Sequence, residues 1–246
     1  MKNGWKLIVA KDPEAVAKIA ADYYEKLIAQ KPDCVLGLAT GSTPIPLYRE
    51  LIAREKAGKI DFHRVRSANL DEYIGLKPTH PQSYRYFMQE NLFNHISIDP
   101  KNTIVPSGVS DDVAATCLEY EKKIEEMGGI DLQLLGIGHD GHIGFNEPCD
   151  EFPKITHEVV LEEMTREANK RFFESIDEVP KKAVTMGIGT VMKAEMVLLI
   201  ATGKDKAEIV KQSFFGPVTP QVPASILQFH PNTVVIVDEA AYSACK

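Results

Sequence analysis

The sequence predicts a single α/β domain that spans residues 1–246 and contains a mainly parallel sheet with helices on both faces. Short apolar segments, typical of buried strands, alternate along the chain with longer segments of helical periodicity. No stretch rich in Gly, Ser or Pro divides the chain into two parts. Hydrophobic residues make up 44% of the chain and charged residues 26%, which excludes a disordered chain and a disulfide scaffold.

In the first half of the chain, each expected strand is followed by a helix. The first helix begins after Asp12, a capping residue, with Pro13 at its first position. Its apolar residues then recur every three or four positions as far as Leu27, and the third helix is rich in aromatic residues. The strands are expected at residues 7–10, 34–39 and 65–70, and the helices at residues 13–27, 44–57 and 82–93.

The second half of the chain continues this alternation. Residues 155–161 alternate between polar and apolar, as in a strand, whereas residues 196–201 and 233–237 are nearly continuous apolar runs, typical of buried strands. The strands are expected at residues 131–136, 155–161, 196–201 and 233–237, and the helices at residues 111–127, 165–175 and 204–212.

Charge and cysteine content limit the partners and the compartment. The 28 basic and 35 acidic residues give a net charge of −7, so we expect no nucleic-acid or membrane partner, although an anionic small molecule is allowed. The four cysteines form no C-x-x-C pair and are expected to be reduced thiols. The apolar run before Lys11 has only four residues, 7–10, which is too short for the core of a signal peptide, and no apolar run approaches the ~18 residues of a membrane span. We therefore expect a soluble cytoplasmic protein.

Ligands of open α/β sheets bind beyond the carboxyl ends of the strands, and two similar turns occur there. Thr40-Gly41-Ser42-Thr43 precedes Pro44 and a helix, so its backbone N–H groups and hydroxyls could hold a phosphate. Ordinary capping of the helix by Thr43 explains the same residues without a ligand. A similar turn at Thr202-Gly203 brings Lys204 and Lys206 to the start of another helix. Cations are unfavourable there because they oppose the helix dipole, and a bound anion would offset this cost.

The residues Asp71-Glu72-Tyr73 follow the strand at 65–70. A carboxylate at a strand end can act as a general base, and Tyr73 could shape the wall of the cleft. Neighbouring side chains of an extended chain point in opposite directions, so only one of the two carboxylates should face the cleft. The alternative is a solvated acidic pair in a loop.

The segment 136–148, Gly136-Ile-Gly-His-Asp-Gly-His-Ile-Gly-Phe-Asn-Glu-Pro148, contains G-x-G-x-x-G after a strand. A dinucleotide fingerprint also needs a helix there, which Gly144 and Pro148 disfavour, so no nicotinamide cofactor is expected. His139, Asp140, His142 and Glu147 are suitable zinc ligands, but the glycine-rich segment gives them no fixed geometry. We favour an acid/base relay in which carboxylates orient an imidazole. A turn whose polar residues cap one another is the remaining alternative.

Three motifs together closely resemble those of the glucosamine-6-phosphate deaminase family. They are Gly37-Leu-Ala-Thr-Gly-Ser-Thr-Pro44, Asn69-Leu-Asp-Glu-Tyr73 and the segment 136–148. The similarity extends from about residue 7 to residue 238 and includes Arg171-Phe-Phe173 and Ser225-Ile-Leu-Gln-Phe-His-Pro231. The resemblance implies a modified Rossmann-like fold without nucleotide, cofactor or metal. It also implies conversion of D-glucosamine 6-phosphate and water to D-fructose 6-phosphate and ammonia.

The resemblance also implies roles for individual residues. Asp71 would be the base that moves a proton between C2 and C1, and His142 would open the sugar ring with Asp140 and Glu147 orienting it. The substrate would be bound, chiefly through its phosphate, by Thr40, Gly41, Ser42, Thr43, Gly138, Arg171 and Lys206. Part of residues 149–175, which include Arg171, is expected to form a mobile lid.

Two other functions are weighed against this reading. A 6-phosphogluconolactonase has a related fold and phosphate loop, but lactone hydrolysis needs no base at C2. A sugar-phosphate sensor would carry an attached DNA-binding or partner module, for which the chain has no spare residues. The resemblance leaves open whether the protein is a monomer or a homo-oligomer. The acidic stretch after Pro148 lacks the serines and basic pair of activated family members, so we expect no activation by N-acetylglucosamine 6-phosphate.

Overall fold

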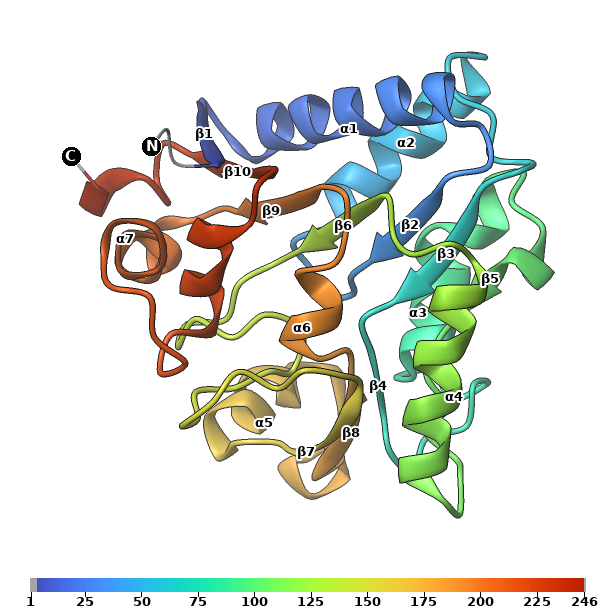
Figure 1. The fold of residues 1–246 in the computed structure, drawn as a ribbon, viewed down its shortest axis with the longest axis vertical. Helices are drawn as coiled ribbons and strands as arrows, with labels where there is room; N and C mark the ends of the chain where they lie inside the picture. Colours follow the sequence, from blue (N-terminus) through green and yellow to red (C-terminus); the bar gives the residue numbers. More distant parts are fainter. Residues whose placement is uncertain (1–3, 246) are drawn as a thin grey trace.

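A parallel β-sheet runs through the centre of the molecule (Figure 1). The computed structural model describes residues 4–245, with the side chains at positions 168 and 172 left out. Within these residues the sheet has seven strands in the order β1-β10-β9-β6-β2-β3-β5, and every neighbouring pair is parallel. In that order the strands are Trp5–Ala10, Thr233–Asp238, Val197–Ala201, Leu132–Leu135, Val35–Leu38, Arg66–Asn69 and Thr103–Ile104. The predicted parallel sheet is thus confirmed, with β5 as an edge strand that the sequence did not predict.

A smaller antiparallel sheet lies beneath the large one in Figure 1. Its strands are β4 (Asp71–Tyr73), β8 (Lys182–Thr185) and β7 (His157–Val160), in that order. The chain passes from β3 through Leu70 directly into β4, so one extended segment belongs to both sheets. The strand expected at 155–161 exists as β7, but in this second sheet, and β4 and β8 were not predicted as strands.

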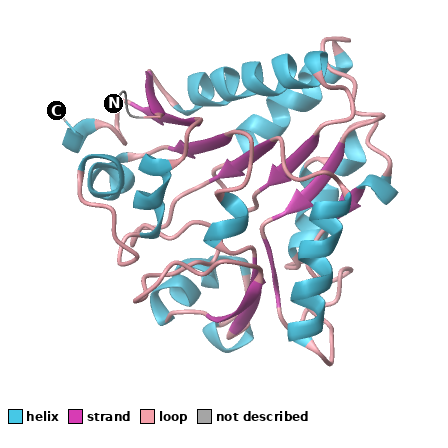
Figure 2. Cartoon of the chain, in the orientation of Figure 1, coloured by secondary structure: helices cyan, strands magenta, loops and turns pink. Residues whose placement is uncertain are grey.

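Helices cover both faces of the large sheet (Figures 1 and 2). α1 and α2 lie on one side of it, and α6 and α7 lie on the other. No helix in the described part of the chain is long and apolar enough to cross a membrane. The helices are α1 (Pro13–Gln30), α2 (Ile45–Lys56), α3 (Tyr84–Asn91), α4 (Val113–Glu126), α5 (Glu163–Asn169), α6 (Ile188–Val191) and α7 (Ala207–Phe215).

The starts of α1 and α2 differ in their caps. Asp12 caps α1 as predicted, because its side chain accepts a hydrogen bond of 2.9 Å from the N–H of Ala15. By contrast, α2 begins at Ile45 without a side-chain cap, so the predicted capping role of Thr43 is wrong. Residues 43 and 44 form a turn instead, and the N–H groups at the start of α2 keep their capacity to bind an anion.

The strand order places several loops together at one edge of the large sheet. From β2 the chain continues to β3 on one side, whereas β6 lies on the other side of β2. Such a switch point leaves a crevice at the carboxyl ends of the strands, where open α/β sheets bind ligands. The segments after β2, β3, β6 and β9, which contain the candidate residues, all begin at this edge.

Candidate active site

A cavity of about 200 Å³ lies at the carboxyl edge of the large sheet. It is lined by nearly all the residues that the sequence singled out: Thr40, Gly41, Ser42, Thr43, Asp71, Gly138, His142, Arg171 and Lys206. These residues come from positions as distant in the chain as 40 and 206, so the fold brings the separate motifs into one site. Asp140 and Glu147 do not line the cavity.

The two Thr-Gly turns have similar backbone conformations. Gly41 has a φ of +98° and Gly203 a φ of +95°, values in the region that side chains other than glycine rarely adopt. Gly203 donates its N–H to both carboxylate oxygens of Asp238 at 3.1 Å, which fixes the second turn to the end of β10. The local echo in the sequence therefore corresponds to two equivalent strand-to-helix turns.

Two cations lie close together beside the first turn. The guanidinium of Arg171 donates to Ser42 Oγ at 3.3 Å, across 129 positions of the chain. Lys206 is half-buried, and burial lowers the pKa of its ammonium group while Asp205 and Asp140 raise it. The charge of Arg171 lowers the same pKa further, which shows that the two cations repel each other. An anion between them and the Thr40–Thr43 turn would remove this repulsion.

Asp71 is a buried carboxyl at the first position of β4, with 6% of its surface exposed. Burial raises its pKa from the ordinary 3.8 to about 8, and the nearby charge of Glu72 adds to the rise. A carboxyl with such a pKa can take up and return a proton near neutral pH, as a general base for carbon acids requires. The alternative of a solvated acidic loop is therefore wrong for this pair.

The expected opposition of Asp71 and Glu72 is confirmed. Asp71 lines the cavity, whereas the Glu72 carboxylate points to the start of α3 and accepts from the N–H groups of Tyr84 and Arg85. Tyr73 does not line the cavity, contrary to our expectation. Its ring packs behind those of Tyr84 and Phe145, with ring centres 4.8 and 5.7 Å apart.

Asp140 makes two contacts with His142, and Gly138 lies against its ring. Its ring Nδ1 lies 2.8 Å from Asp140 Oδ1, and its backbone N–H donates to the same oxygen at 3.0 Å. Burial alone would raise the pKa of Asp140, but the ring and backbone of His142 hold this pKa below its usual value. Gly138 lies directly against the imidazole, because a Cβ at that position would overlap the ring atoms of His142. With Nδ1 engaged, Nε2 is the ring nitrogen that remains for proton exchange.

Glu147 lies behind this pair and makes a different contact. Its Oε2 accepts from the N–H of Glu162 at 2.8 Å, at the start of α5. Burial raises the pKa of Glu147, while the Thr165 hydroxyl, the Glu162 N–H and the His142 ring lower it. Its effect on His142 is one of charge, and its hydrogen bond ties the segment 136–148 to the segment that contains α5.

The geometry of segment 136–148 bears on the two alternatives that its sequence raised. The segment forms no helix, so the condition for a dinucleotide fingerprint is absent there. His139 Nε2 lies 2.9 Å from Asp205, away from the Asp140–His142 pair. Within residues 4–245, no three His, Cys, Asp or Glu side chains are arranged to hold a metal ion. Asp140 and His142 contact each other, whereas His139 and Glu147 are turned to other partners, Asp205 and the N–H of Glu162.

Aromatic side chains form a wall of the cavity that the sequence analysis missed. Tyr84, the first residue of α3, lines the cavity with Phe145, and the two rings stack with centres 5.9 Å apart and planes 17° apart. The aromatic content of residues 82–93 was the one available signal, but it did not show which ring would face the site. Such a stacked pair excludes water from one side of Asp71.

Comparison with known proteins agrees with this geometry. A family model described as glucosamine-6-phosphate isomerases/6-phosphogluconolactonase matches residues 11–236. Among similar sequences, a glucosamine-6-phosphate deaminase of Clostridium perfringens is 52% identical and covers 98% of this chain and 100% of its own. The deaminase of Lachnoclostridium phytofermentans is 57% identical over 94% of this chain and 98% of its own.

Solved structures show the same fold. A monomeric glucosamine-6-phosphate deaminase superposes with a TM-score of 0.95, is 44% identical, and covers 97% of this chain and 99% of its own. A 6-phosphogluconolactonase from Thermotoga maritima has a TM-score of 0.73 and 22% identity, over 96% of this chain and 99% of its own. At that identity the second likeness concerns the fold alone.

Proposed function

Because the chain belongs to the family of glucosamine-6-phosphate isomerases and 6-phosphogluconolactonases, we infer its reaction from its closely similar members. Relatives at 52% and 57% identity are glucosamine-6-phosphate deaminases. The chain is an enzyme of amino-sugar catabolism that converts D-glucosamine 6-phosphate and water to D-fructose 6-phosphate and ammonia. The site supports this function because the buried carboxyl of Asp71 shares one cavity with two cations and with His142, whose ring Nδ1 lies 2.8 Å from Asp140.

We propose that the phosphate binds between the Thr40–Thr43 turn, Arg171 and Lys206. The uncapped start of α2 offers backbone N–H groups, and the positive φ of Gly41 turns the backbone toward the ligand. Arg171 can make two parallel hydrogen bonds to a phosphate, whereas Lys206 contributes a point charge. A bound dianion would separate the charges of these two side chains and restore the ordinary pKa of Lys206.

His142 then opens the sugar ring. Its Nε2 would take the proton of the O1 hydroxyl and give a proton to the ring oxygen as the bond between C1 and the ring oxygen breaks, which leaves an aldehyde at C1. Asp140 holds the ring by Nδ1 and stabilises its cationic form. Gly138 supports this step because its lack of a side chain lets the imidazole lie against the backbone.

Asp71 carries the isomerisation. As a carboxylate it would remove the proton from C2, giving an enolic amine, and would return that proton to C1. As this proton reaches C1, the nitrogen lone pair forms the C2=N bond, and O1 becomes a hydroxyl with the proton that the substrate's ammonium group has lost. Water then adds at C2, and ammonia leaves to give the ketone of fructose 6-phosphate. Burial beside Tyr84 and Phe145 keeps water from competing for the proton during the transfer.

One assay separates the deaminase from the lactonase alternative. We expect purified protein to release ammonia and fructose 6-phosphate from glucosamine 6-phosphate, and not to accelerate hydrolysis of 6-phosphogluconolactone. Hydrolysis of the lactone without ammonia release would overturn the proposed function. Binding of the sugar phosphate without turnover would instead favour a sensor.

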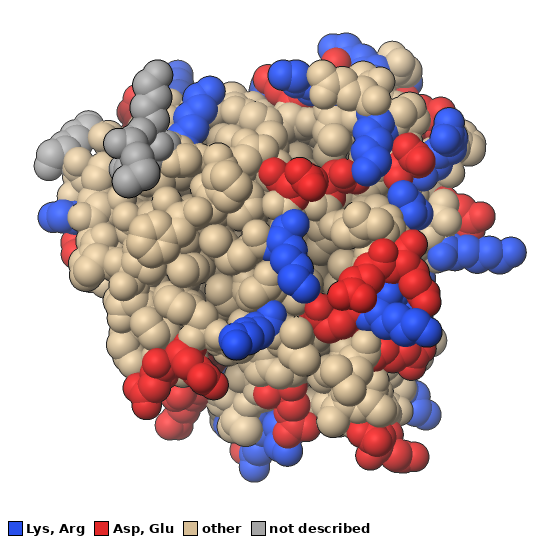
Figure 3. All heavy atoms as spheres, in the orientation of Figure 1, with Lys and Arg blue, Asp and Glu red and all other residues tan. Residues whose placement is uncertain are grey.

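The remaining expectations concern partners, compartment and motion. On the face shown in Figure 3, basic and acidic side chains are interspersed, which fits the expectation of no nucleic-acid or membrane partner. The cysteines of the described chain are free, as in a reducing compartment, and we propose the cytoplasm as the location. We propose that part of residues 149–175 moves as a lid, because Arg171 within it reaches Ser42 across the mouth of the cavity. We propose that the protein acts as a monomer, as the solved deaminase at 44% identity does, or as a homo-oligomer.

A further inference from the structure

Glu72 is a buried carboxylate on the side of β4 that faces away from the reaction cavity. Only 2% of its surface is exposed, and it accepts three backbone hydrogen bonds. The donors are the N–H groups of Tyr73 at 2.9 Å, Tyr84 at 2.8 Å and Arg85 at 3.0 Å. Burial raises the pKa of Glu72, and the three N–H donors oppose this rise because they favour its ionised form and hold the carboxylate in place.

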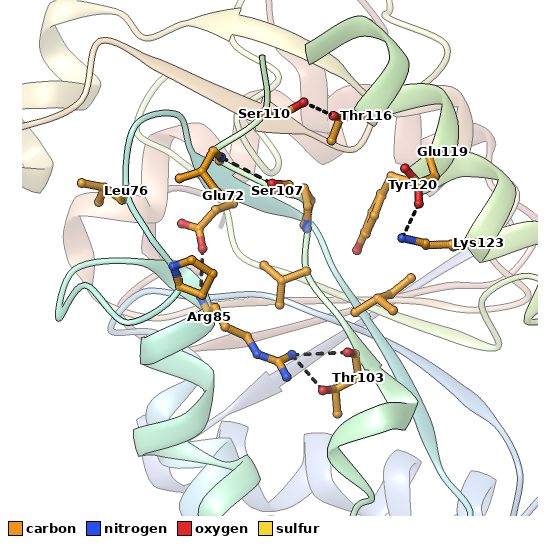
Figure 4. A pocket seen from close by; sticks show the side chains of 16 residues that line it. Glu72, Leu76, Arg85, Thr103, Ser107, Ser110, Thr116, Glu119, Tyr120 and Lys123 are labelled. Atoms are coloured by element: carbon orange, nitrogen blue, oxygen red, sulfur yellow. Dashed lines mark hydrogen bonds and ion pairs between the residues drawn. The ribbon is translucent and has the colours of Figure 1, made fainter. Parts of the chain in front are cut away.

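The surroundings of Glu72 keep its side chain in this position. It lies in the wall of a second cavity, of about 500 Å³, where Figure 4 shows its carboxylate directed at the start of α3 beside Arg85. Gly108 lies against Glu72 from the other side, since a Cβ at position 108 would come within 3.3 Å of Glu72 Cγ. The N–H of Gly75 donates to Gly108 O at 2.7 Å and fixes that contact.

This contact links the catalytic strand to the aromatic wall of the reaction cavity. Two of the three donors belong to the first residues of α3, and Tyr84 is the residue whose ring stacks on Phe145 and lines the site. Asp71 is the neighbour of Glu72 in β4. Glu72 therefore holds the Tyr84 ring in the wall of the cavity, and it also places a negative charge next to Asp71.

The charge of Asp71 itself acts on four tyrosine hydroxyls. They are Tyr48 on α2, Tyr73 on β4, Tyr84 on α3 and Tyr120 on α4. Burial raises the pKa of each hydroxyl above its ordinary value, so all four stay neutral when a carboxyl titrates. Among the described residues, Glu72 is then the group whose negative charge raises the pKa of Asp71.

We propose that Glu72 is a positioning residue of this reaction, which holds Tyr84 at the wall of the cavity and keeps a negative charge behind Asp71. The inference rests on the proposed deaminase function. It assigns two effects to one side chain, a steric one through α3 and an electrostatic one through β4, and the two can be separated by choice of variant.

The test compares Glu72→Gln and Glu72→Asp with the wild type in the deaminase assay over pH 5–9. Glu72→Gln removes the charge, so the acid limb of kcat/KM, which reports the base of the free enzyme, should move to lower pH by roughly 0.5–1 unit. Glu72→Asp keeps the charge but is one methylene too short to reach α3. Its acid limb should coincide with that of the wild type, while KM rises by about 3–10-fold because Tyr84 is displaced.

Glu119→Gln is the matched control, because Glu119 lines the same second cavity but pairs with Lys123 at the surface. It should leave both the pH profile and KM unchanged. An unmoved acid limb in Glu72→Gln would overturn the proposal, even if the variant were less stable, because it would show that the charge of Glu72 does not act on the base. If Glu72→Gln does not fold, Glu72→Asp decides alone, and a displaced limb or an unchanged KM in it would overturn the proposal. Absence of ammonia release by the wild type would refute the proposed function instead.

Discussion

Replacement of Asp71 by Asn should abolish turnover and at the same time stabilise the protein at alkaline pH. The amide keeps the shape of the carboxyl but cannot take a proton from C2, so kcat should fall by roughly 10²–10⁴-fold. KM should stay within a few-fold of the wild type, because Asp71 is separate from the proposed phosphate contacts. Activity within a few-fold of the wild type would refute the role of Asp71 as the base.

The effect on stability follows from the pKa of the same group. In the folded protein the pKa of Asp71 is about 8, against the ordinary 3.8, so the folded state binds this proton more tightly than the unfolded chain does. Below pH 3.8 the carboxyl is protonated in both states and has no effect. As the pH rises toward 8, only the unfolded chain gains from ionisation, so the wild type loses stability over this window and the loss levels off above it.

Each pH unit of this window corresponds to about 1.4 kcal/mol, so the full displacement of about 4 units sets an upper limit of ~6 kcal/mol. We expect Asp71→Asn to be more stable than the wild type by ~2–5 kcal/mol at pH 8.5, and equal to it near pH 4. Urea unfolding at pH 4, 6.5 and 8.5 measures the difference directly. A constant difference at all three values, or a more stable wild type at pH 8.5, would refute the reasoning about burial.

Four further predictions concern the rest of the site. His142→Gln should be slow on the cyclic sugar phosphate but partly spared on an open-chain substrate, and equal losses on both would contradict a ring-opening role. Gly138→Ala should lower kcat by about 10–100-fold through displacement of the imidazole, whereas Gly136→Ala, where a Cβ meets nothing within 4 Å, should behave as the wild type. If both alanines have the same effect, the packing argument fails. Dialysis against a strong chelator should leave turnover intact; loss of activity that zinc restores would establish a metal site. Finally, kinetics should be hyperbolic and unaffected by N-acetylglucosamine 6-phosphate. In the stretch after Pro148, where an activator's phosphate would have to bind, the N–H and hydroxyl of Thr156 already donate to Glu121, so a phosphate at this position would meet a carboxylate. A sigmoidal curve that this compound made hyperbolic would show the opposite.

The features that the sequence predicted are those that short-range physics determines. The strands β9 and β10 are apolar at nearly every position and are buried along their whole length, as a strand covered on both faces must be. The opposite orientations of Asp71 and Glu72 follow from the two-residue period of an extended chain, which holds whatever the strand pairs with. The site at the carboxyl edge follows from the parallel order of the strands.

The features that the sequence did not predict depend on contacts between distant segments. β4 has three residues, and it is a strand because Asp71 pairs with Thr185 on β8, more than a hundred positions later in the chain. Neither segment has enough alternation to mark it as a strand alone. The contact of Arg171 with Ser42 and the stacking of Tyr84 on Phe145 are of the same kind. In each case the residue type was visible, but its partner depended on the completed fold.

The glycines of segment 136–148 illustrate why a motif acquires its meaning from its surroundings. In a dinucleotide-binding turn, G-x-G-x-x-G allows the backbone to approach a pyrophosphate and a helix to begin. Here no helix begins, and Gly138 allows the approach of a side chain, the imidazole of His142. Gly141, with a φ of +89°, turns the chain so that His142 can return its carbonyl to the N–H of Gly138 at 2.9 Å. The same absence of side chains thus lets a small loop close around the ring of His142, and any substituent at position 138 would act directly on the imidazole.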